Sequence, residues 1–263
     1  SGGTTNMWTV MGAGDELGAS PRAVAKIDGE WSSDEANQIY ITGWTTDVDN
    51  YIKVYTTSLA RHLGKWDDSK YRIQVEDYTT FQISEDFVRV EGLQISSFET
   101  GLGTMRGLRV RYTEYGEIYI SSNILKAATS SLTYTAISLS DDTSNHYIYN
   151  NLIYKEAQLT TGIGSAGSSV GANVYNNTIY GASGHGINDN NDQYILKNNL
   201  VIDSGAGAED GYDGNASSTA STHNASDVVS DAPGQNAVLV SDDVFVSTST
   251  YDFHLKENAR KTI

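Results

Sequence analysis

Charged side chains that could do acid–base or metal chemistry lie in and after four short apolar segments, at 107–110, 136–139, 162–164 and 186–188. Paired carboxyl groups can act as general acid and base, and a basic side chain can remove a proton. Carboxylate oxygens are also hard ligands that suit Ca²⁺. The catalytic candidates are Arg109, Arg111, Asp141, Asp142, His185 and Asp189, and the candidate metal ligands are Asp141, Asp142, Asp189 and Asp192.

A six-residue pattern alternates with these segments: an apolar residue, any residue, a small residue or Asn, then Asn, any residue and an apolar residue. It occurs at 120–125, 148–153, 174–179 and 196–201, and a degenerate copy occupies 90–95. The fourth positions are Leu93, Asn123, Asn151, Asn177 and Asn199, so the period is 30, 28, 26 and then 22 residues. Two short β segments per period, without a helical stripe, predict a β-solenoid rather than leucine-rich repeats or a propeller.

The repeated Asn explains how successive coils could be held together. In a parallel coil each side chain stacks on its equivalent in the next coil, roughly 4.8 Å away. The apolar first and sixth positions then point inward from two strands that meet at a bend. We expect the Asn of the fourth position to lie at the bend, in the left-handed conformation it tolerates well. Its amide should hydrogen-bond from coil to coil, as stacked amides do in other ladders.

Tyr residues flank the same pattern. The position after the first apolar residue is Tyr149 in one copy and Tyr175 in the next, and the position after the last is Tyr154 and then Tyr180. Alternation along a strand directs these side chains outward, so two exposed Tyr ladders are predicted. Rows of amphipathic rings could bind sugar rings or a partner protein, or could only stabilise adjacent coils.

Composition narrows the possible partners. The chain has 263 residues, no Cys, and a net charge of −16 from 33 acidic and 17 basic residues. An acidic chain without a basic face is a poor partner for nucleic acid. No apolar run reaches the roughly 18 residues of a membrane span. The start, Ser1-Gly2-Gly3, lacks the charged and apolar regions of a signal peptide, so none is expected there.

The chain is predicted to be all-β and to form one domain over 1–263. Residues 1–35 are expected to form an N-terminal cap with a short helix at 20–27, because Ser20 is a candidate N-cap and Pro21 suits the first helical position. Residues 36–202 should form the coils. Residues 203–236, rich in Ser, Ala, Asn, Asp and Gly, are interpreted as a long loop, and residues 237–263 as closing strands.

The Asn-turn copies between 118 and 202 resemble the right-handed parallel β-helix proteins with pectate-lyase-like repeats. Segments 43–47, 61–66, 70–72, 87–95 and 252–255 resemble, more narrowly, uncharacterised β-helix proteins from environmental bacteria and bacteriophages. This resemblance implies a single right-handed parallel β-helix. It says little about activity, because the fold carries lyases, hydrolases, tail spikes, adhesins and inert scaffolds.

The resemblance also implies where a polysaccharide would bind, namely along the outside of the Gly-Ile strands. Gly184-His185-Gly186 matches a short motif of polygalacturonase-like enzymes, and Asp141-Asp142 resembles their paired carboxylates. However, these two sites are 43 residues apart, nearly two coils, and the family's Asn-Thr-Asp and Arg-Ile-Lys motifs are missing. A lyase that uses Ca²⁺ and Arg109 or Arg111 is therefore favoured over a hydrolase, although the acidic surface would repel polyuronates unless a metal intervened.

No assembled acid–base motif accompanies the regular scaffold, so the leading hypothesis is a non-enzymatic surface or structural protein. It would be a phage virion component or a secreted adhesive or structural module, located outside the cell or on the virion surface. Its partners would be itself, a neighbouring surface protein or a polysaccharide, with no nucleic acid and no membrane span. No cofactor is expected. The alternative is a polysaccharide-degrading enzyme, a lyase with Ca²⁺ before a hydrolase.

Overall fold

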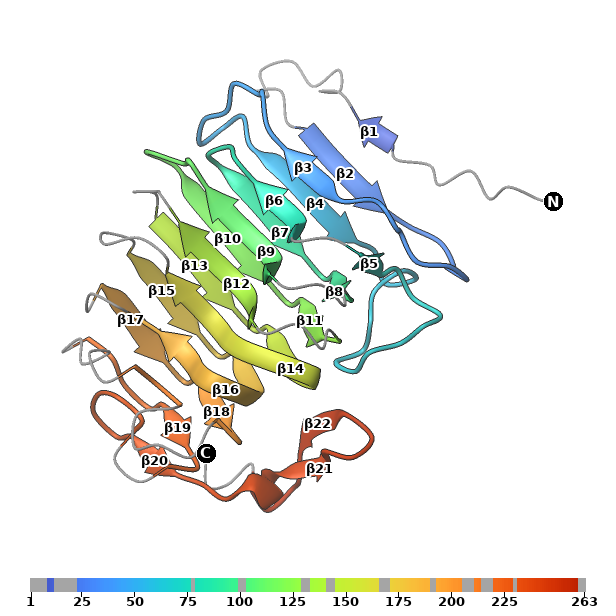
Figure 1. Ribbon diagram of the computed structural model, residues 1–263. Coiled ribbons are helices and arrows are strands. Elements are labelled where there is room, and N and C mark those ends of the chain that lie inside the picture. Colours follow the sequence, from blue (N-terminus) through green and yellow to red (C-terminus); the bar gives the residue numbers. More distant parts are fainter. Residues whose placement is uncertain are drawn as a thin grey trace.

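The computed structural model describes residues 9–11, 23–76, 79–98, 103–128, 133–140, 145–165, 171–189, 193–204, 211–213, 220–228 and 231–259. In these residues the chain is almost entirely β-structure and winds as a right-handed parallel β-helix (Figure 1). The predicted fold class is therefore confirmed. None of the described helical segments is long and apolar enough to cross a membrane.

One sheet contains the strands that precede each bend. Its seven parallel strands stack in chain order, and the short β1 (Thr9–Met11) pairs antiparallel with the first of them. The parallel strands are β2 (Ala23–Ile27), β4 (Ile52–Thr56), β7 (Val88–Glu91), β10 (Glu117–Ser121), β13 (Asn145–Tyr149), β15 (Ala172–Tyr175) and β17 (Tyr194–Lys197).

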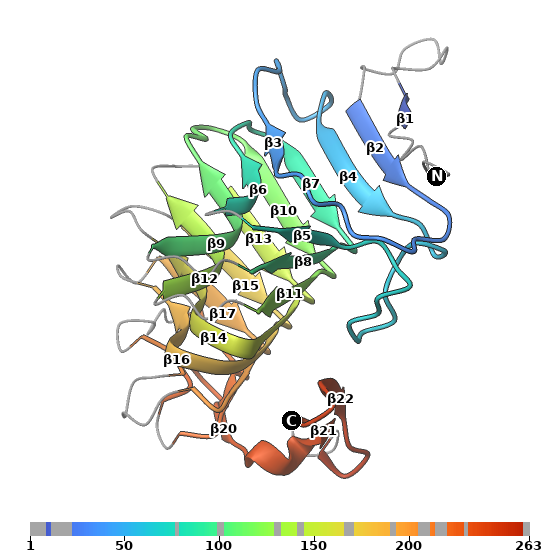
Figure 2. The ribbon, with the colours of Figure 1, turned by 45° about the vertical axis from the view of Figure 1, so that its right-hand side comes forward.

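The strands after the bend form a second, folded sheet. One limb contains β5 (Ile73–Val75), β8 (Gln94–Ser97), β11 (Ile124–Ala127), β18 (Leu200–Ile202), β19 (Ala225–Ser226) and β20 (Val238–Leu239). The other limb contains β3 (Ile39–Ile41), β6 (Thr79–Ile83), β9 (Thr104–Arg111) and β12 (Thr133–Ser140). The long strands β14 (Leu152–Ser165) and β16 (Thr178–Asn188) run around the corner and join both limbs (Figure 2).

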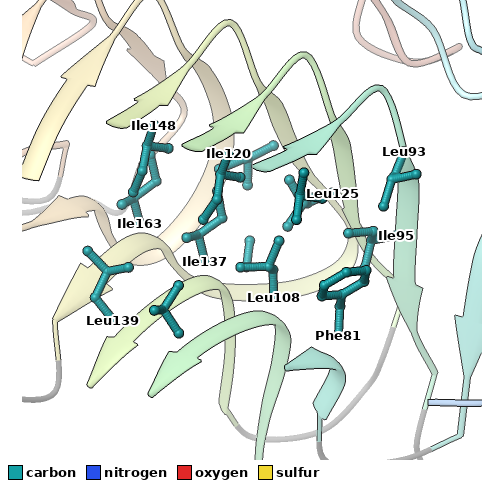
Figure 3. Close-up of a cluster of buried hydrophobic side chains, with 14 of the residues drawn as sticks. Phe81, Leu93, Ile95, Leu108, Ile120, Leu125, Ile137, Leu139, Ile148 and Ile163 are labelled. Carbon is teal, nitrogen blue, oxygen red and sulfur yellow. The ribbon is translucent and has the colours of Figure 1, made fainter. Parts of the chain in front are cut away.

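The core is a column of stacked apolar side chains inside the coils. Phe81, Leu108, Ile137 and Ile163 occupy equivalent positions on successive strands, and all are fully buried. In Figure 3, Ile163 and Ile137 lie next to Ile148 and Ile120 of the opposite sheet, while Leu108 and Phe81 lie next to Leu125 and Ile95 of the other limb. The inward alternation read from the repeats is thus confirmed, and burial of this column supplies the hydrophobic stabilisation of the fold.

The hydrogen bonds confirm the predicted Asn ladder. The Nδ2 atoms of Asn123, Asn151, Asn177 and Asn199 each donate to the Oδ1 atom of the next ladder Asn, at 3.0 Å. The same Oδ1 atoms accept the backbone N–H of the preceding ladder Asn at 3.0–3.1 Å. Each Nδ2 also donates to a carbonyl of an earlier strand, such as Ile148 for Asn177. Every ladder amide is therefore buried with its hydrogen bonds satisfied.

The left-handed residue of the bend is the third position, not the ladder Asn, so that expectation is wrong. Ser122, Asn150, Asn176 and Asn198 have φ of 54° to 56°, whereas no ladder Asn has positive φ. The third residue makes the turn and is exposed or half-buried. The turn frees the fourth residue to direct its amide along the coil axis, where it meets the amide of the next coil.

The region interpreted as a long loop at 203–236 also contributes to the solenoid. Asn224 continues the ladder, because its Oδ1 accepts from Asn199 Nδ2 at 3.0 Å and its side chain is fully buried. The strand β19 follows directly and pairs in parallel with β18 and β20.

The predicted N-terminal helix at 20–27 is wrong. Ala23–Ile27 forms β2, which pairs in parallel with β4 over five residues, from Ala23 opposite Ile52 to Ile27 opposite Thr56. Pairing with the next coil satisfies the backbone of this segment and overrides its local helix-start signal. Ser20 and Pro21 lie outside the described residues.

The last part of the chain leaves the coil and forms the antiparallel hairpin of β21 (Phe245–Ser247) and β22 (Asp252–Leu255), after the 3₁₀ segment η1 (Asp242–Val244). In Figure 1 the hairpin lies beside the ends of β14 and β16. The Phe253 ring lies 5.1 Å from the rings of both Tyr154 and Tyr180, measured between centroids. The hairpin therefore covers the outer face of these two strands.

We expect the replacement Asn177→Ala to destabilise the protein by at least about 3 kcal/mol, because it leaves buried donors and acceptors of the two neighbouring coils without partners. The measurement is denaturant unfolding at equilibrium. Asn176→Gly is the matched control, since Asn176 is exposed and has φ of 54°. It should change stability by less than about 1 kcal/mol. Equal losses in the two variants would contradict the structural role of the ladder.

Removing the Phe253 ring should release the hairpin from the side of the solenoid. The replacement Phe253→Ala is expected to weaken local stability by about 3 kcal/mol, as for other buried rings. Hydrogen exchange should show faster exchange in β21 and β22, with the coils still protected. Val246→Ala is the control because Val246 is 51% exposed. Unchanged protection of the hairpin in Phe253→Ala would refute this packing.

Candidate functional site

The outer face of the Gly-Ile strands contains a shallow polar groove. The register aligns Arg106, Thr135, Thr161 and His185 in one outward row across β9, β12, β14 and β16. A neighbouring row aligns Arg109, Ser138, Gly164 and Asn188. Between them lies a groove of about 180 Å³ whose lining is mostly hydroxyl and amide groups. This face carries the basic and His candidates that were predicted from the sequence.

The candidate residues on this face have separate structural contacts. Arg109 Nε donates to Ser140 Oγ at 3.2 Å, and the Arg111 guanidinium lies 4.0 Å from the ring centroid of Tyr112. Asp189 is buried, and its two carboxylate oxygens accept the backbone N–H groups of Gln193 and Tyr194 at 3.0 and 2.7 Å. Both oxygens of Asp189 that a metal would need are thus engaged by backbone N–H groups.

The remaining acidic candidates, Asp141, Asp142 and Asp192, lie outside the described residues. Within the described ranges, no three His, Asp or Glu side chains come together as a possible metal site. The face therefore supplies cations and hydroxyl groups, while the predicted calcium ligands stay a prediction.

Two rows of charged and aromatic side chains lie on the outside of the other sheet, which contains β4, β7, β10 and β13. The register aligns Lys53, Arg89, Tyr119 and Tyr147 across β4, β7, β10 and β13. The adjacent row runs from Tyr55 through Glu91, Ser121 and Tyr149 to Tyr175. We call this surface the Tyr face and define it by these two rows. It combines aromatic rings, two cations and a carboxylate on one rigid sheet.

The first row of the Tyr face is a stack of rings and a guanidinium group. The rings of Tyr119 and Tyr147 are stacked and nearly parallel, at an interplanar angle of 9° with 4.7 Å between centroids. Arg89 lies on the other side of Tyr119, 5.2 Å from its centroid, and 3.8 Å from that of Tyr51. Burial raises the pKa of Tyr119 to about 12, and its hydroxyl donates to Glu117. The faces of the Tyr119 ring are therefore occupied on both sides.

The second row leaves a hollow of about 290 Å³ lined by Lys53, Arg89, Glu91, Tyr119, Ser121 and Tyr149. Ser121 is the small residue of its row and lies opposite Tyr149 on the next strand and Glu91 on the preceding one. A hydroxymethyl side chain between larger neighbours creates the hollow. Among the described residues, Tyr149 has no ring or ion-pair partner, so its ring is the wall available to a ligand.

The carboxylate of the hollow is held by two cations. Glu91 Oε2 lies 3.1 Å from Lys53 Nζ, and Glu91 Oε1 lies 2.7 Å from Arg61 Nη2. Burial opposes ionisation of Glu91, but the hydrogen bonds from Arg61 and Lys53 outweigh it, so the pKa of this carboxyl is lower than usual. Glu91 is thus an oriented acceptor that stays charged at neutral pH.

The predicted Tyr ladders have different outcomes. Tyr149 lies opposite Tyr175, and Tyr154 lies opposite Tyr180, so both registers are confirmed. The predicted exposure of Tyr154 is wrong, because the hairpin covers it and leaves it 1% exposed. This burial raises the pKa of Tyr154. Only the Tyr149–Tyr175 pair belongs to an open surface.

Five residues of the hollow are not among the site residues predicted from the sequence, namely Lys53, Arg89, Glu91, Tyr119 and Ser121. Their signal in the sequence is the alternation of strands 52–55, 88–91 and 117–121, where every second residue is a buried Val or Ile. The outward positions between them carry the charged and aromatic groups.

The fold defines this chain as a right-handed parallel β-helix protein, and the Tyr face gives it a candidate binding site. No protein-family model, curated protein or solved structure matches the chain. Its function is therefore argued from the geometry of the site.

The loop between β4 and β5 supports the hollow from the side. Arg61 extends from it to Glu91, and the next residue, His62, is buried beneath the bend that precedes Asn123. His62 Nδ1 accepts the Gly64 N–H at 3.2 Å, so Nε2 carries the proton donated to the Ser122 carbonyl at 2.9 Å. Burial lowers the pKa of His62 to about 4 despite this hydrogen bond, and nearby Arg61 lowers it further.

Stability should consequently fall with acidity over the range that His62 controls. The unfolded chain binds a proton at His62 near pH 6.5, while the folded chain does so only near pH 4. The contribution of His62 is therefore complete above about pH 6.5 and is lost as the pH falls to about 4, at roughly 1.4 kcal/mol per pH unit. Equilibrium unfolding against pH should show this slope in the native protein and a shallower one in His62→Gln. Parallel curves would contradict it.

Proposed function

We propose that this protein is a non-enzymatic surface module that binds carbohydrate in the hollow of the Tyr face. The observation that carries the proposal is the lining of the hollow, where an available Tyr149 ring faces an oriented carboxylate and cations around the small Ser121. A pyranose ring has apolar C–H faces and a rim of hydroxyl groups, and it needs both kinds of partner.

In this proposal the sugar ring lies above Ser121 and packs against Tyr149. Its hydroxyl groups donate to Glu91, which Lys53 and Arg61 hold in place at 3.1 and 2.7 Å. Lys53 and Arg89 donate to ring or hydroxyl oxygens. The sheet that carries all these groups is rigid, so little ordering entropy is lost on binding.

The setting of such a module follows from its surface. A net charge of −16 and a continuous solvated face suit a protein displayed outside the cell or on a virion. Its partners would be a polysaccharide, a neighbouring surface protein or another copy of the chain. The alternative function is polysaccharide cleavage by a lyase on the Gly-Ile face, which is favoured by Arg106 in the lining of the polar groove and by Arg109 on the same strand.

Glycan-array binding tests the proposal. The native protein should bind a defined set of glycans, and Tyr149→Ala and Ser121→Leu should each weaken binding at least about tenfold, since one removes the wall and the other fills the hollow. Tyr115→Ala is the control, because Tyr115 is 86% exposed and lies on the turn after β9, away from the hollow.

Two results would contradict the proposal. Glycan binding that is equal in Tyr149→Ala, Ser121→Leu and the native protein would exclude the hollow as the site. Turnover of alginate or pectate with Ca²⁺, seen as a rise in unsaturated-product absorbance that Arg109→Ala abolishes, would replace it with the lyase function.

A further inference from the structure

The guanidinium group of Arg89 lies between two aromatic rings. Its carbon is 3.8 Å from the Tyr51 ring centroid and 5.2 Å from the Tyr119 centroid. Rings attract the flat faces of a guanidinium group, and this contact is stronger for Arg than for Lys. The two rings therefore fix the group in position while leaving its N–H donors, which lie in the guanidinium plane, uncovered by the rings.

These donors have no acid partner. In the part of the chain that the structure describes, Arg89 makes its two ring contacts but no ion pair and no hydrogen bond. Several other cations on the molecule do have a carboxylate partner: Arg61 pairs with Glu91, Lys126 with Glu156 and Lys155 with Asp203. A shortage of acidic residues cannot explain the difference, since the chain has 33 acidic residues against 17 basic ones.

The hollow is positively charged although the protein is acidic. Its lining contains two cations, Lys53 and Arg89, and one anion, Glu91. Arg61 approaches Glu91 from outside the lining and compensates its charge further, with an N–O distance of 2.7 Å. A bound anion would therefore meet Arg89 donors that are fixed in advance, beside a carboxylate whose charge is already balanced.

We infer that Arg89 binds an oxyanion substituent of the ligand: a carboxylate, sulfate or phosphate group. A guanidinium group presents parallel N–H donors that match two oxygens of such a group. Attached to a sugar, the oxyanion would lie against Arg89 while the ring packs on Tyr149. The identity of the ligand as a glycan rests on the proposed function, whereas the oxyanion site stands on the geometry of Arg89.

Titration with simple anions tests the site without a glycan. Sodium sulfate, phosphate and acetate should each shift the amide NMR signals of β7 and β10, at constant ionic strength. Arg89→Met keeps an apolar stem between the rings. It should lower the affinity for the best-binding anion by at least about tenfold, as expected for loss of a charge-assisted pair. Lys155→Gln is the matched control, because it removes an ion-paired cation from another face. The affinity of this variant for the anion should stay within about twofold of the native value.

A second variant distinguishes the contribution of the paired guanidinium donors from that of the positive charge alone. Arg89→Lys should also lose about tenfold in affinity, because an ammonium group cannot make the paired contact. Full affinity in Arg89→Lys, or in Arg89→Met with an unchanged unfolding midpoint, would overturn the inference. If an Arg89 variant unfolds, Tyr51→Leu supplies the test, since loss of one ring should weaken anion binding several-fold.

The two proposals can fail separately. Anion binding at Arg89 without any glycan binding would refute the proposed function and support the oxyanion site. Glycan binding through Tyr149 that shows no preference for carboxylated, sulfated or phosphorylated sugars over neutral ones, and is the same in Arg89→Met, would refute the oxyanion site. The most specific outcome is a preference for one class of acidic sugar that disappears in Arg89→Met.

Discussion

Most of this structure depends on one interaction, the hydrogen bond between the side-chain amides of ladder Asn residues in adjacent coils. The side-chain oxygen of a ladder Asn accepts two N–H groups from the preceding coil, and the same Asn donates its backbone N–H and its Nδ2–H to the ladder oxygen of the following coil. A buried amide with an unmade hydrogen bond is costly, so the coils cannot slip past one another by a residue. The ladder thereby fixes the register of both sheets, and a fixed register is what aligns the apolar column inside.

The same register produces the Tyr face outside. Inward and outward residues alternate, so a strand held in place by its buried Val and Ile residues also places its outward residues in rows. Arg89, Tyr119 and Tyr147 stack because Val90, Ile120 and Ile148 stack beside them. The hollow is the point where this regularity is interrupted by the small Ser121. A binding site can thus arise from one residue replacement on a scaffold whose other positions are constrained.

The fold could be predicted because its essential signal is the regular spacing of a short pattern along the sequence. Such a spacing can be recognised without knowing which residues are in contact in the folded chain. Asn123, Asn151, Asn177 and Asn199 are recognisable by their apolar neighbours. Asn224 is not, because Ser221 and Ser226 replace those neighbours, and only the three-dimensional structure shows its place in the ladder. The helix predicted at 20–27 is wrong for the opposite reason, since the segment carries a local helix signal but the strand that decides its structure, β4, lies in the next coil.

The site could be predicted only in part, because long-range contacts decide which Tyr residues remain open. Tyr154 and Tyr149 have equivalent sequence signals, yet Phe253, about a hundred residues later, covers the first and leaves the second free. The residue type at Gly92, at the start of the ladder, is also decided by a long-range contact, here with Arg61. Its φ is 79°, and a Cβ atom there would lie 2.3 Å from Arg61 Nε. Arg61 crosses this bend to reach Glu91, and Leu93 occupies the ladder position but still donates its backbone N–H to Asn123 at 2.9 Å. The first coil of the ladder is therefore built around the residue that orients the carboxylate of the hollow, which joins the stability of the scaffold to the geometry of its binding site.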